Sequence, residues 1–454
     1  MIDQRRVLPL NQHSYTAGSV VYVMAREQRV EDNWALLHAA ALANLRAVPL
    51  VVVFALAPMF NHGSARHNEW MVASLQEVQK NLERYAIPFF VITGKWEDSL
   101  PAFVVQEQIG EIVFDFNPLE PVRTWREAVA SKVTVPVSMV DARNIVPCFV
   151  ASDKTEFAAY TFRPKVTRLV PEYLTAYKPI TVAVPYTKPV PVIDWEAMRA
   201  YRRCDYSEII PTRLVPGEQA GQAVLKQFIA ERLTGYATQR NDPTLGMTSD
   251  LSPYLRWGNL SAARVAMAVQ AAEVPAEDKD AFLEELIVRR ELADNYCYYT
   301  REHTVIAGAH AWAQKTVAEH AFDTREYLYS YEAFRDAKTH DDLWNAAQTQ
   351  MVQEGKMHGF LRMYWAKKIL EWTPDAQTAI DVALRLNDHY ELDGRDSNGV
   401  TGVMWSICGV HDRAWNERSV FGKIRYMNYA GCKRKFDVQA FVRRYSTVAD
   451  TTLF

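Results

Sequence analysis

The segment from residue 355 to residue 373, GKMHGFLRMYWAKKILEWT, combines oxidisable rings with a cation on a short stretch of chain. Trp365 and Trp372 are seven residues apart, and Arg362 precedes Trp365 by three residues. At about 100° of rotation per helical residue, both indoles lie on nearly the same face, about two turns apart. A third indole, Trp344, lies a short loop upstream. Such a stripe usually packs in a core, but three neighbouring indoles can also relay an electron, and spacing alone does not decide between these.

A second group of reactive side chains lies in the hydroxyl-rich segment 235–261. Thr248, Ser249 and Ser252 cluster where the chain is expected to enter a helix at SPYLRWG. Hydroxyls and backbone N–H groups at such a position can bind phosphate oxygens. The same residues also cap helices routinely, so the local pattern leaves both roles open.

Charged residues mark two further segments. In EELIVRRELADNYCYY, residues 284–299, Glu285 and Arg289 are four positions apart among apolar helix positions. They can pair on a surface, or Glu285 can point at a ligand. The segment 423–444 carries seven Lys or Arg and one Asp, interleaved with aromatic residues. It could receive a phosphate backbone or form a solvated helix end.

The composition is that of a globular protein of two or three domains, with 454 residues, 49% hydrophobic residues and a net charge of −3. No segment approaches the ~20 apolar residues of a membrane-spanning helix, and the N-terminus does not resemble a signal peptide. The five cysteines are scattered singly, which opposes a disulfide framework or a cysteine-based metal site. We therefore expect a soluble intracellular protein of the cytoplasm or nucleoid, with no metal and no membrane partner.

The pattern of hydrophobic residues differs between the two halves of the chain. Short β-branched runs predict five strands buried on both faces, at residues 19–24, 49–56, 88–94, 111–116 and 135–141. Helical patterns lie between them, for example at 33–47 and 69–86. This order predicts a doubly wound parallel sheet of the α/β class. No GxGxxG follows the first strand, so a standard dinucleotide site is not indicated there.

The second half of the chain is helical in pattern. Examples are residues 217–233, 259–273, 277–296, 341–354, 357–372 and 376–390. Between the halves, residues 177–195 contain four prolines, which oppose both a helix and a central strand. The predicted organisation is an α/β domain (residues 1–150), a long surface linker (151–215) and an all-helical domain (216–454).

Six motifs in one order extend over most of the chain, from about residue 19 to about residue 436. They are residues 24–36 (MAREQRVEDNWAL), 242–258, 284–299, 356–373, 383–415 and 420–437. In these motifs the chain resembles the photolyase/cryptochrome flavoproteins, and specifically the class II cyclobutane pyrimidine dimer photolyases. The resemblance implies a Rossmann-like antenna domain followed by a helical domain that binds FAD.

The resemblance assigns a set of flavin contacts. These are Tyr236, Thr248, Ser249, Leu251, Ser252, Arg362, Trp365, Asn387 and Asp393. Within this set, Arg362 and Asp393 form an ion pair beside the flavin ring, and Asn387 faces flavin N5. A neutral amide can form hydrogen bonds but cannot readily donate a proton as a carboxylic acid can, which favours repair over signalling.

The resemblance also gives the three indoles a redox role. Trp365 is expected nearest the flavin, Trp344 passes the charge outward, and Trp372 forms a side branch. Tyr329 and Tyr364 are expected to assist.

The lesion-binding residues follow from the same resemblance. Glu285 is expected to contact the carbonyl edge of a pyrimidine dimer, and Trp405 to pack on the flipped bases. Further pocket and duplex contacts are Gly359, Met363, Arg240, Asp412, Arg413 and Arg425. The implied activity is light-driven repair of UV-damaged DNA by electron transfer from excited reduced FAD, with Glu285, Asn387, Trp365, Trp344 and Trp372 as the catalytic group.

Several alternatives stay open at this point. The α/β domain could hold an 8-hydroxy-5-deazaflavin or a folate as antenna chromophore, or an empty site. Arg26, Arg29 and Asp32 could pair locally or contact the helical domain, and the role of Arg289 is undefined. The rival functions are a cryptochrome-like photoreceptor without repair activity and a non-enzymatic DNA-binding protein. A monomer without an obligate protein partner is expected.

Overall fold

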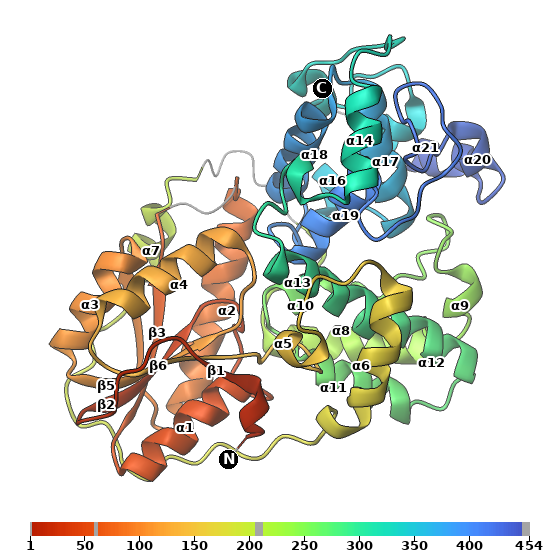
Figure 1. Cartoon of the computed structure of the whole chain (residues 1–454). Coiled ribbons are helices and arrows are strands. Elements are labelled where there is room, and N and C mark those ends of the chain that lie inside the picture. Colours follow the sequence, from red (N-terminus) through yellow and green to blue (C-terminus); the bar gives the residue numbers. More distant parts are fainter. Residues whose placement is uncertain (1, 59–61, 205–211, 447–454) are drawn as a thin grey trace, which may run out of the picture.

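The computed structural model describes residues 2–58, 62–204 and 212–446. An α/β layer lies beside a larger helical part (Figure 1). The described residues form one six-stranded sheet in the order β1-β6-β5-β2-β3-β4. The strands are β1 (Val7–Pro9), β2 (Ser19–Met24), β3 (Leu50–Leu56), β4 (Phe89–Thr93), β5 (Ile109–Asp115) and β6 (Val137–Val140).

The five predicted strands are confirmed as the parallel strands β2 to β6. The prediction missed β1, a three-residue edge strand that pairs antiparallel with β6. Such a short strand shows no alternation in the sequence, and it contains Pro9, which is tolerated only at an edge. The central strands β3 and β5 are buried along their whole length, which explains their unbroken apolar sequences.

Helices cover both faces of the sheet. Helices α1 (Trp34–Arg46) and α2 (Ala65–Glu83) cover the face whose core continues into the helical part. Helices α3 (Trp96–Gln106) and α4 (Glu120–Lys132) cover the opposite face. Asn33 begins α1, because its side chain accepts hydrogen bonds from the backbone N–H groups of Ala35 and Leu36.

The helical part consists of two groups of helices (Figure 1). The first group packs against α1 and α2 and comprises α8 (Glu218–Glu231), α9 (Tyr236–Gln239), α10 (Ser252–Arg256), α11 (Ala262–Ala271), α12 (Ala276–Leu283), a π-helical stretch η2 (Glu284–Arg289) and α13 (Arg290–Tyr299). The second group has its own core and comprises α14 (Ala311–Glu319), α15 (Tyr331–Arg335), α16 (Asp342–Glu354), α17 (Gly359–Glu371), α18 (Ala376–Tyr390), α19 (Ser397–Cys408), α20 (Tyr429–Lys433) and α21 (Val438–Ser446). There are also two short 3₁₀ turns, η1 (Gln4–Arg6) and η3 (Ile306–Gly308).

Residues 151–215 contain more structure than the predicted surface linker. After α5 (Cys148–Ala151), helix α6 (Ala159–Tyr173) lies against η2 and buries Phe162 and Val166. Pro164 and Pro171 lie inside α6, upstream of the four prolines at 177–195 on which the linker prediction was based. Helix α7 (Trp195–Tyr201) packs on α2, while residues 174–194 contain neither helix nor strand. Residues 205–211 of the predicted linker and 447–454 of the predicted helical domain lie outside the described residues.

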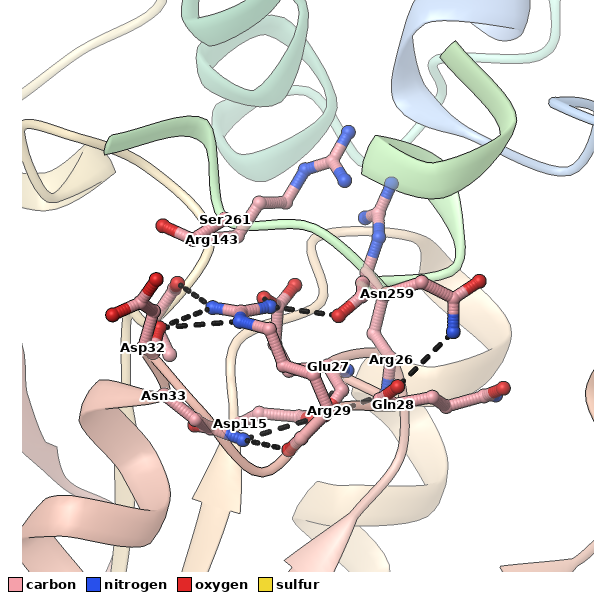
Figure 2. A network of polar contacts seen from close by, with 12 residues as sticks. Arg26, Glu27, Gln28, Arg29, Asp32, Asn33, Asp115, Arg143, Asn259 and Ser261 are labelled. Carbon is pink, nitrogen blue, oxygen red and sulfur yellow. Dashed lines mark hydrogen bonds and ion pairs between the residues drawn. The ribbon is translucent and has the colours of Figure 1, made fainter. Parts of the chain in front are cut away.

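The loop between β2 and α1 joins the sheet to the helical part (Figure 2). Arg29 is 1% exposed and donates a hydrogen bond to the carbonyl of Gly258 at 2.9 Å. Asp32 accepts two hydrogen bonds from Arg264, at 2.6 and 2.7 Å. Gly258 has φ +68°, and a Cβ there would lie 2.4 Å from the carbonyl oxygen of Arg26. The arginine-rich motif therefore contacts the helical part, and Arg29 also pairs locally with Glu27.

A buried ion network extends this contact toward the second helical group. Arg143 donates to Asp294 at 2.8 Å and to both carboxylate oxygens of Asp396 at 3.0 Å, and Arg26 also pairs with Asp396. All four side chains are almost completely buried. Removing one partner of a buried pair typically costs about 3–5 kcal/mol, so these pairs hold the two parts of the molecule in one arrangement.

Candidate functional site

A cavity of about 790 Å³ lies between the two groups of helices. This volume is within the range that holds a large cofactor or ligand. Most of the predicted site residues line it: Tyr236, Arg240, Thr248, Ser249, Ser252, Glu285, Gly359, Arg362, Met363, Trp365, Asn387, Asp393, Trp405 and Arg425. Elements that are far apart in the sequence therefore bring these side chains around one space.

Three predicted contacts lie elsewhere. Leu251 is 1% exposed, and its side chain packs in the hydrophobic core instead of lining the cavity. Asp412 and Arg413 belong to the loop after α19, where Asp412 accepts hydrogen bonds from the Arg413 amide at 2.9 Å and from the Trp415 indole at 3.3 Å. Leu251 directly precedes α10, which begins at Ser252. At this position the Leu251 side chain lies in the core, while Ser252 lines the cavity.

An arginine between two carboxylates forms the floor of the cavity. Arg362 donates two hydrogen bonds to Asp393, at 2.9 and 3.0 Å, and a third to Glu391, at 2.7 Å. Burial raises the pKa of Glu391 to about 8. Although burial opposes it, Arg362 holds the pKa of Asp393 below its usual value. Burial thus favours the protonated form of Glu391, whereas Arg362 favours the ionised form of Asp393.

Glu391 was not among the predicted site residues. Its carboxylate also accepts the backbone N–H of Met357 at 3.0 Å, which ties the end of α18 to the start of α17. The sequence contained a signal, because Glu391 precedes Asp393 by two residues in one acidic motif.

Asn387 is held beside the cavity by close packing. Its Nδ2 donates to Asp388 at 2.9 Å, and Asp388 also accepts the Arg395 amide at 2.7 Å. A Cβ at position 399 would lie 2.7 Å from the Asn387 Nδ2, so only glycine leaves room for the amide. Gly399 thus keeps this space open at the cavity wall.

A buried aspartate anchors the hydroxyl-rich loop that lines the cavity. Asp250 accepts hydrogen bonds from Arg213 at 2.9 Å, from Arg232 at 2.8 Å and from Lys356 at 2.9 Å. Burial alone would raise the pKa of Asp250, but these three cations lower it well below its usual value. The ion cluster fixes the backbone that carries the predicted hydroxyl contacts.

The three tryptophans form one series that starts at the cavity. Trp365 lines the cavity and stacks on Trp344 at a centroid distance of 6.2 Å and an interplanar angle of 8°. Trp344 contacts Trp372, also at 6.2 Å. Trp344 is completely buried and Trp372 is 2% exposed. Trp372 therefore reaches the series through Trp344, and its role as a side branch stays a prediction.

The open end of the cavity is aromatic and cationic. Glu285 pairs with Arg240 at 3.0 Å, and its side chain is 39% exposed. Arg240, Arg289 and Arg425 line this part of the cavity, and Arg425 lies 5.9 Å from the ring centroid of Trp405. Lys367 lies 4.9 Å from the same ring but is completely buried, and burial lowers its pKa to about 7. A planar group stacked on Trp405 would thus meet the arginines.

A smaller cavity of about 70 Å³ lies at the carboxyl ends of the parallel strands. Its wall includes Ala25 after β2, Asn117 after β5, and the indoles of Trp96 and Trp125. The strand order reverses between β2 and β5, which is where ligands bind in open α/β sheets. An antenna chromophore is expected at this place, but the cavity is far smaller than the roughly 300–1,000 Å³ of typical ligand sites.

The sequence comparisons agree with this arrangement. The DNA photolyase family model matches residues 20–186. The deoxyribodipyrimidine photo-lyase of Potorous tridactylus is 49% identical over 431 residues, covering 94% of this chain and 81% of the relative. The protein with the same name from Oryza sativa subsp. japonica is 48% identical over 441 residues, covering 94% and 87%.

Solved structures share the fold. An archaeal photolyase from Sulfolobus tokodaii, described with two FAD molecules, matches with a TM-score of 0.71 and 17% identity, over 95% of this chain and 91% of that one. A Synechocystis cryptochrome matches with a TM-score of 0.73 and 15% identity, over 96% and 89%. The fold is therefore that of the photolyase/cryptochrome flavoproteins.

By its similarity to the curated relatives over most of its length, the chain belongs to the DNA photolyase family. The prediction that it is an enzyme of the photo-lyase type is confirmed by the same relatives. Class II, the subgroup suggested by the motifs, stays a prediction. Within the described part of the chain, no helix is long and apolar enough to cross a bilayer.

Proposed function

We propose that this enzyme uses light to repair cyclobutane pyrimidine dimers in DNA, with FAD bound in the large cavity. The observation that carries the proposal is the cavity itself. A series of three tryptophans begins at its floor beside Arg362 and Asn387. Its open end presents Trp405 together with Arg240 and Arg425.

The donor set along the cavity fits FAD. Hydroxyls from Thr248, Ser249 and Ser252 suit a diphosphate and a ribityl chain, and Arg362 suits the polar edge of the ring system. When bound, the reduced flavin supplies a one-electron donor that light makes strongly reducing. The protein binds and orients this group and keeps water away from it.

Asn387 controls proton supply at the cavity floor. Its amide can form a hydrogen bond to a ring nitrogen of the flavin but has no acidic proton to give. The neighbouring acid Asp388 accepts a hydrogen bond from the Asn387 amide instead of facing the cavity directly. This arrangement supports an electron-rich, unprotonated cofactor.

The residues at the open end bind the flipped dimer. Trp405 offers a stacking surface, which is worth ~1–3 kcal/mol per base. Glu285 is placed to contact the carbonyl edge of the dimer, and Arg240 holds Glu285 in position at 3.0 Å. Arg425, Asp412 and Arg413 then contact the opened duplex. Flipping costs a few kcal/mol and least for a damaged pair, which favours the lesion over intact DNA.

The tryptophan series serves cofactor activation. Electrons move inward from Trp372 through Trp344 to Trp365 when the cofactor has been oxidised. An antenna chromophore, a deazaflavin or a folate, would fit beside Trp96 and Trp125 only if the walls of the smaller cavity moved apart, because about 70 Å³ is too little space for either. We further propose that the enzyme acts as a monomer on UV-damaged duplex DNA without an obligate protein partner.

The test uses purified, chemically reduced protein and an oligonucleotide with one thymine dimer. Intact thymines should reappear under blue light and not in darkness. Glu285→Ala should slow the repair, whereas Lys80→Ala, an exposed change on α2, should not. Normal photoreduction without any dimer repair would contradict the proposal and favour a cryptochrome-like photoreceptor.

A further inference from the structure

Both acidic groups at the cavity floor belong to one short segment, residues 390–394, which we call the acidic segment. Its side chains Glu391 and Asp393 hold Arg362. Four of its backbone carbonyls accept hydrogen bonds from side chains on other elements. The donors and acceptors are Arg66 and Tyr390 (3.1 Å), His67 and Glu391 (2.7 Å), Trp257 and Leu392 (3.0 Å), and Arg256 and Gly394 (2.8 Å).

Two of these donors come from the α/β domain. Arg66 and His67 lie in the first turn of α2. Arg66 also donates to the carbonyl of Val352 at 2.7 Å, in the last turn of α16, while Tyr390 is the last residue of α18. The last carbonyls of a helix have no partner within the helix. One arginine of the α/β domain therefore satisfies the ends of two helices beside the large cavity.

The hydrogen-bond partners of His67 define its tautomer. The ring is completely buried, and its Nδ1 accepts the backbone N–H of Ser64 at 3.2 Å. Nε2 therefore carries the hydrogen and donates it to the Glu391 carbonyl. Burial, and then the nearby guanidinium groups of Arg395 and Arg256, lower the pKa of His67 well below its usual value. The neutral ring thus holds the acidic segment without adding a charge beside its carboxyl groups.

The contact between α2 and the acidic segment is tightly packed. Gly355, in the turn after α16, has φ +67°, and a Cβ there would lie 3.0 Å from a guanidinium nitrogen of Arg66 and 2.9 Å from the Leu392 side chain. The Leu392 N–H also donates to the Gly355 carbonyl at 2.7 Å. The start of α2, this turn and the acidic segment therefore form one packed unit.

We propose that Arg66 and His67 are positioning residues for the light-driven reaction, through which the α/β domain fixes Arg362 beside the cofactor. The proposal rests on the proposed function, because it concerns a flavin in the large cavity. Neither residue is among the described residues that line this cavity, so both act through the backbone of the acidic segment. With its carbonyls held, Glu391 and Asp393 stay where they hold Arg362.

A fixed guanidinium affects the charge state of the cofactor. A cation beside the polar edge of the flavin ring stabilises the negative charge of the reduced form more than the neutral oxidised form. If the acidic segment moves, Arg362 moves with the groups that hold it, and this stabilisation falls. Loss of the His67 hydrogen bond should therefore lower the reduction potential of the flavin and weaken its binding.

The first test compares two substitutions at position 67 in the full-length, flavin-loaded protein. His67→Leu fills the space but leaves the Glu391 carbonyl without its donor. It should bind flavin about tenfold more weakly, which corresponds to ~1.4 kcal/mol, and should have a lower flavin reduction potential. Redox titration followed by flavin absorption measures the potential. His67→Gln keeps an N–H donor and should restore both values. Equal behaviour of the two variants would overturn the assignment.

Two further variants separate positioning from general packing of α2. Arg66→Met removes the other donor at a half-buried position and should lower the potential in the same direction. Ser74→Ala is the matched control, because Ser74 is 1% exposed on the same helix and donates to the Trp70 carbonyl at 2.8 Å. Its flavin potential should equal that of the wild type. A shift as large as that of His67→Leu would assign the effect to helix packing and overturn the proposal.

Failure of this inference can be told apart from failure of the proposed function. The flavin measurements need no DNA. A wild-type potential in both His67→Leu and Arg66→Met, with normal dimer repair by the wild type, would overturn the inference alone. Reduced, flavin-loaded wild-type protein that repairs no dimers under blue light would overturn the proposed function.

Discussion

The two ends of the large cavity are built differently. At the floor, Arg362 is held by Asp393 and Glu391 with three hydrogen bonds, and Trp365 is 3% exposed. At the open end, Glu285 and Arg289 keep 39% and 49% of their side chains exposed. The floor is thus fixed before anything binds, whereas the open end is still accessible to water.

This difference suits a cofactor that stays bound at the floor and a substrate that enters and leaves at the open end. A cofactor that stays bound needs its charges in place, and a buried ion pair without its partner is costly. A substrate that enters and leaves needs groups that remain solvated until it arrives, because their desolvation reduces the affinity. If the floor holds the cofactor and the open end holds the substrate, variants at one end should leave the function of the other end unchanged.

Arg362→Ala should have the largest effect. It leaves Asp393 buried without its cation, which typically costs about 3–5 kcal/mol. We expect a lower free energy of unfolding and loss of bound flavin, measured by urea unfolding and by the absorption of the purified protein. Arg289→Ala at the open end is the control, and it should keep its flavin. Equal flavin loss in both variants would remove the distinction between floor and open end.

Trp405→Ala should have the next largest effect, confined to the open end. Loss of a stacking surface should weaken binding of dimer-containing DNA by ~1–3 kcal/mol. Titration with labelled oligonucleotides in darkness measures this. Flavin content should stay at the wild-type level, and a colourless Trp405→Ala protein would show that the two ends are not independent.

The sheet was predictable because its signals are local. Strands buried on both faces need unbroken apolar sequences, so β2 to β6 stand out in the sequence, whereas the edge strand β1 does not. Helix α6 was missed because the linker, predicted from four prolines at 177–195, was extended back to residue 151. The helix itself contains Pro164 and Pro171. A helix tolerates such prolines where tertiary packing compensates, here through burial of Phe162 and Val166.

The site was predictable by residue type but not by geometry. Family motifs identified Trp344, Trp365 and Trp372, but only the packing of α16 against α17 shows that they lie in contact. Glu391 lies in the motif at 383–415, two residues before Asp393. Its role arises from its contact with Arg362 on the neighbouring helix, which the sequence alone does not show.

Glu391→Gln should change how stability depends on pH. The folded-state pKa of about 8 is above the value of about 4.3 in the unfolded chain, so the folded protein keeps a proton that the unfolded chain releases. The free energy of unfolding should therefore fall as pH rises through this window, by up to ~1.4 kcal/mol per unit. The variant should show a flatter profile in urea unfolding. An unchanged slope would mean that Glu391 is ionised throughout and that the floor carries one more negative charge.

Arg425→Ala should have the smallest effect and should act through charge alone. Arg425 lies 5.9 Å from the Trp405 ring and 4.6 Å from the Trp415 ring, so it stands beside the surface where the dimer stacks. Removing one phosphate contact should lower the slope of log affinity against log salt by about 1, for damaged and intact DNA alike. Binding titrations over a range of salt concentrations measure this, with Lys80→Ala on α2 as the control. If Arg425→Ala instead reduced only lesion affinity at every salt concentration, the arginine would belong with Trp405 as a lesion contact, and the open end would be more strictly preorganised than its exposure suggests.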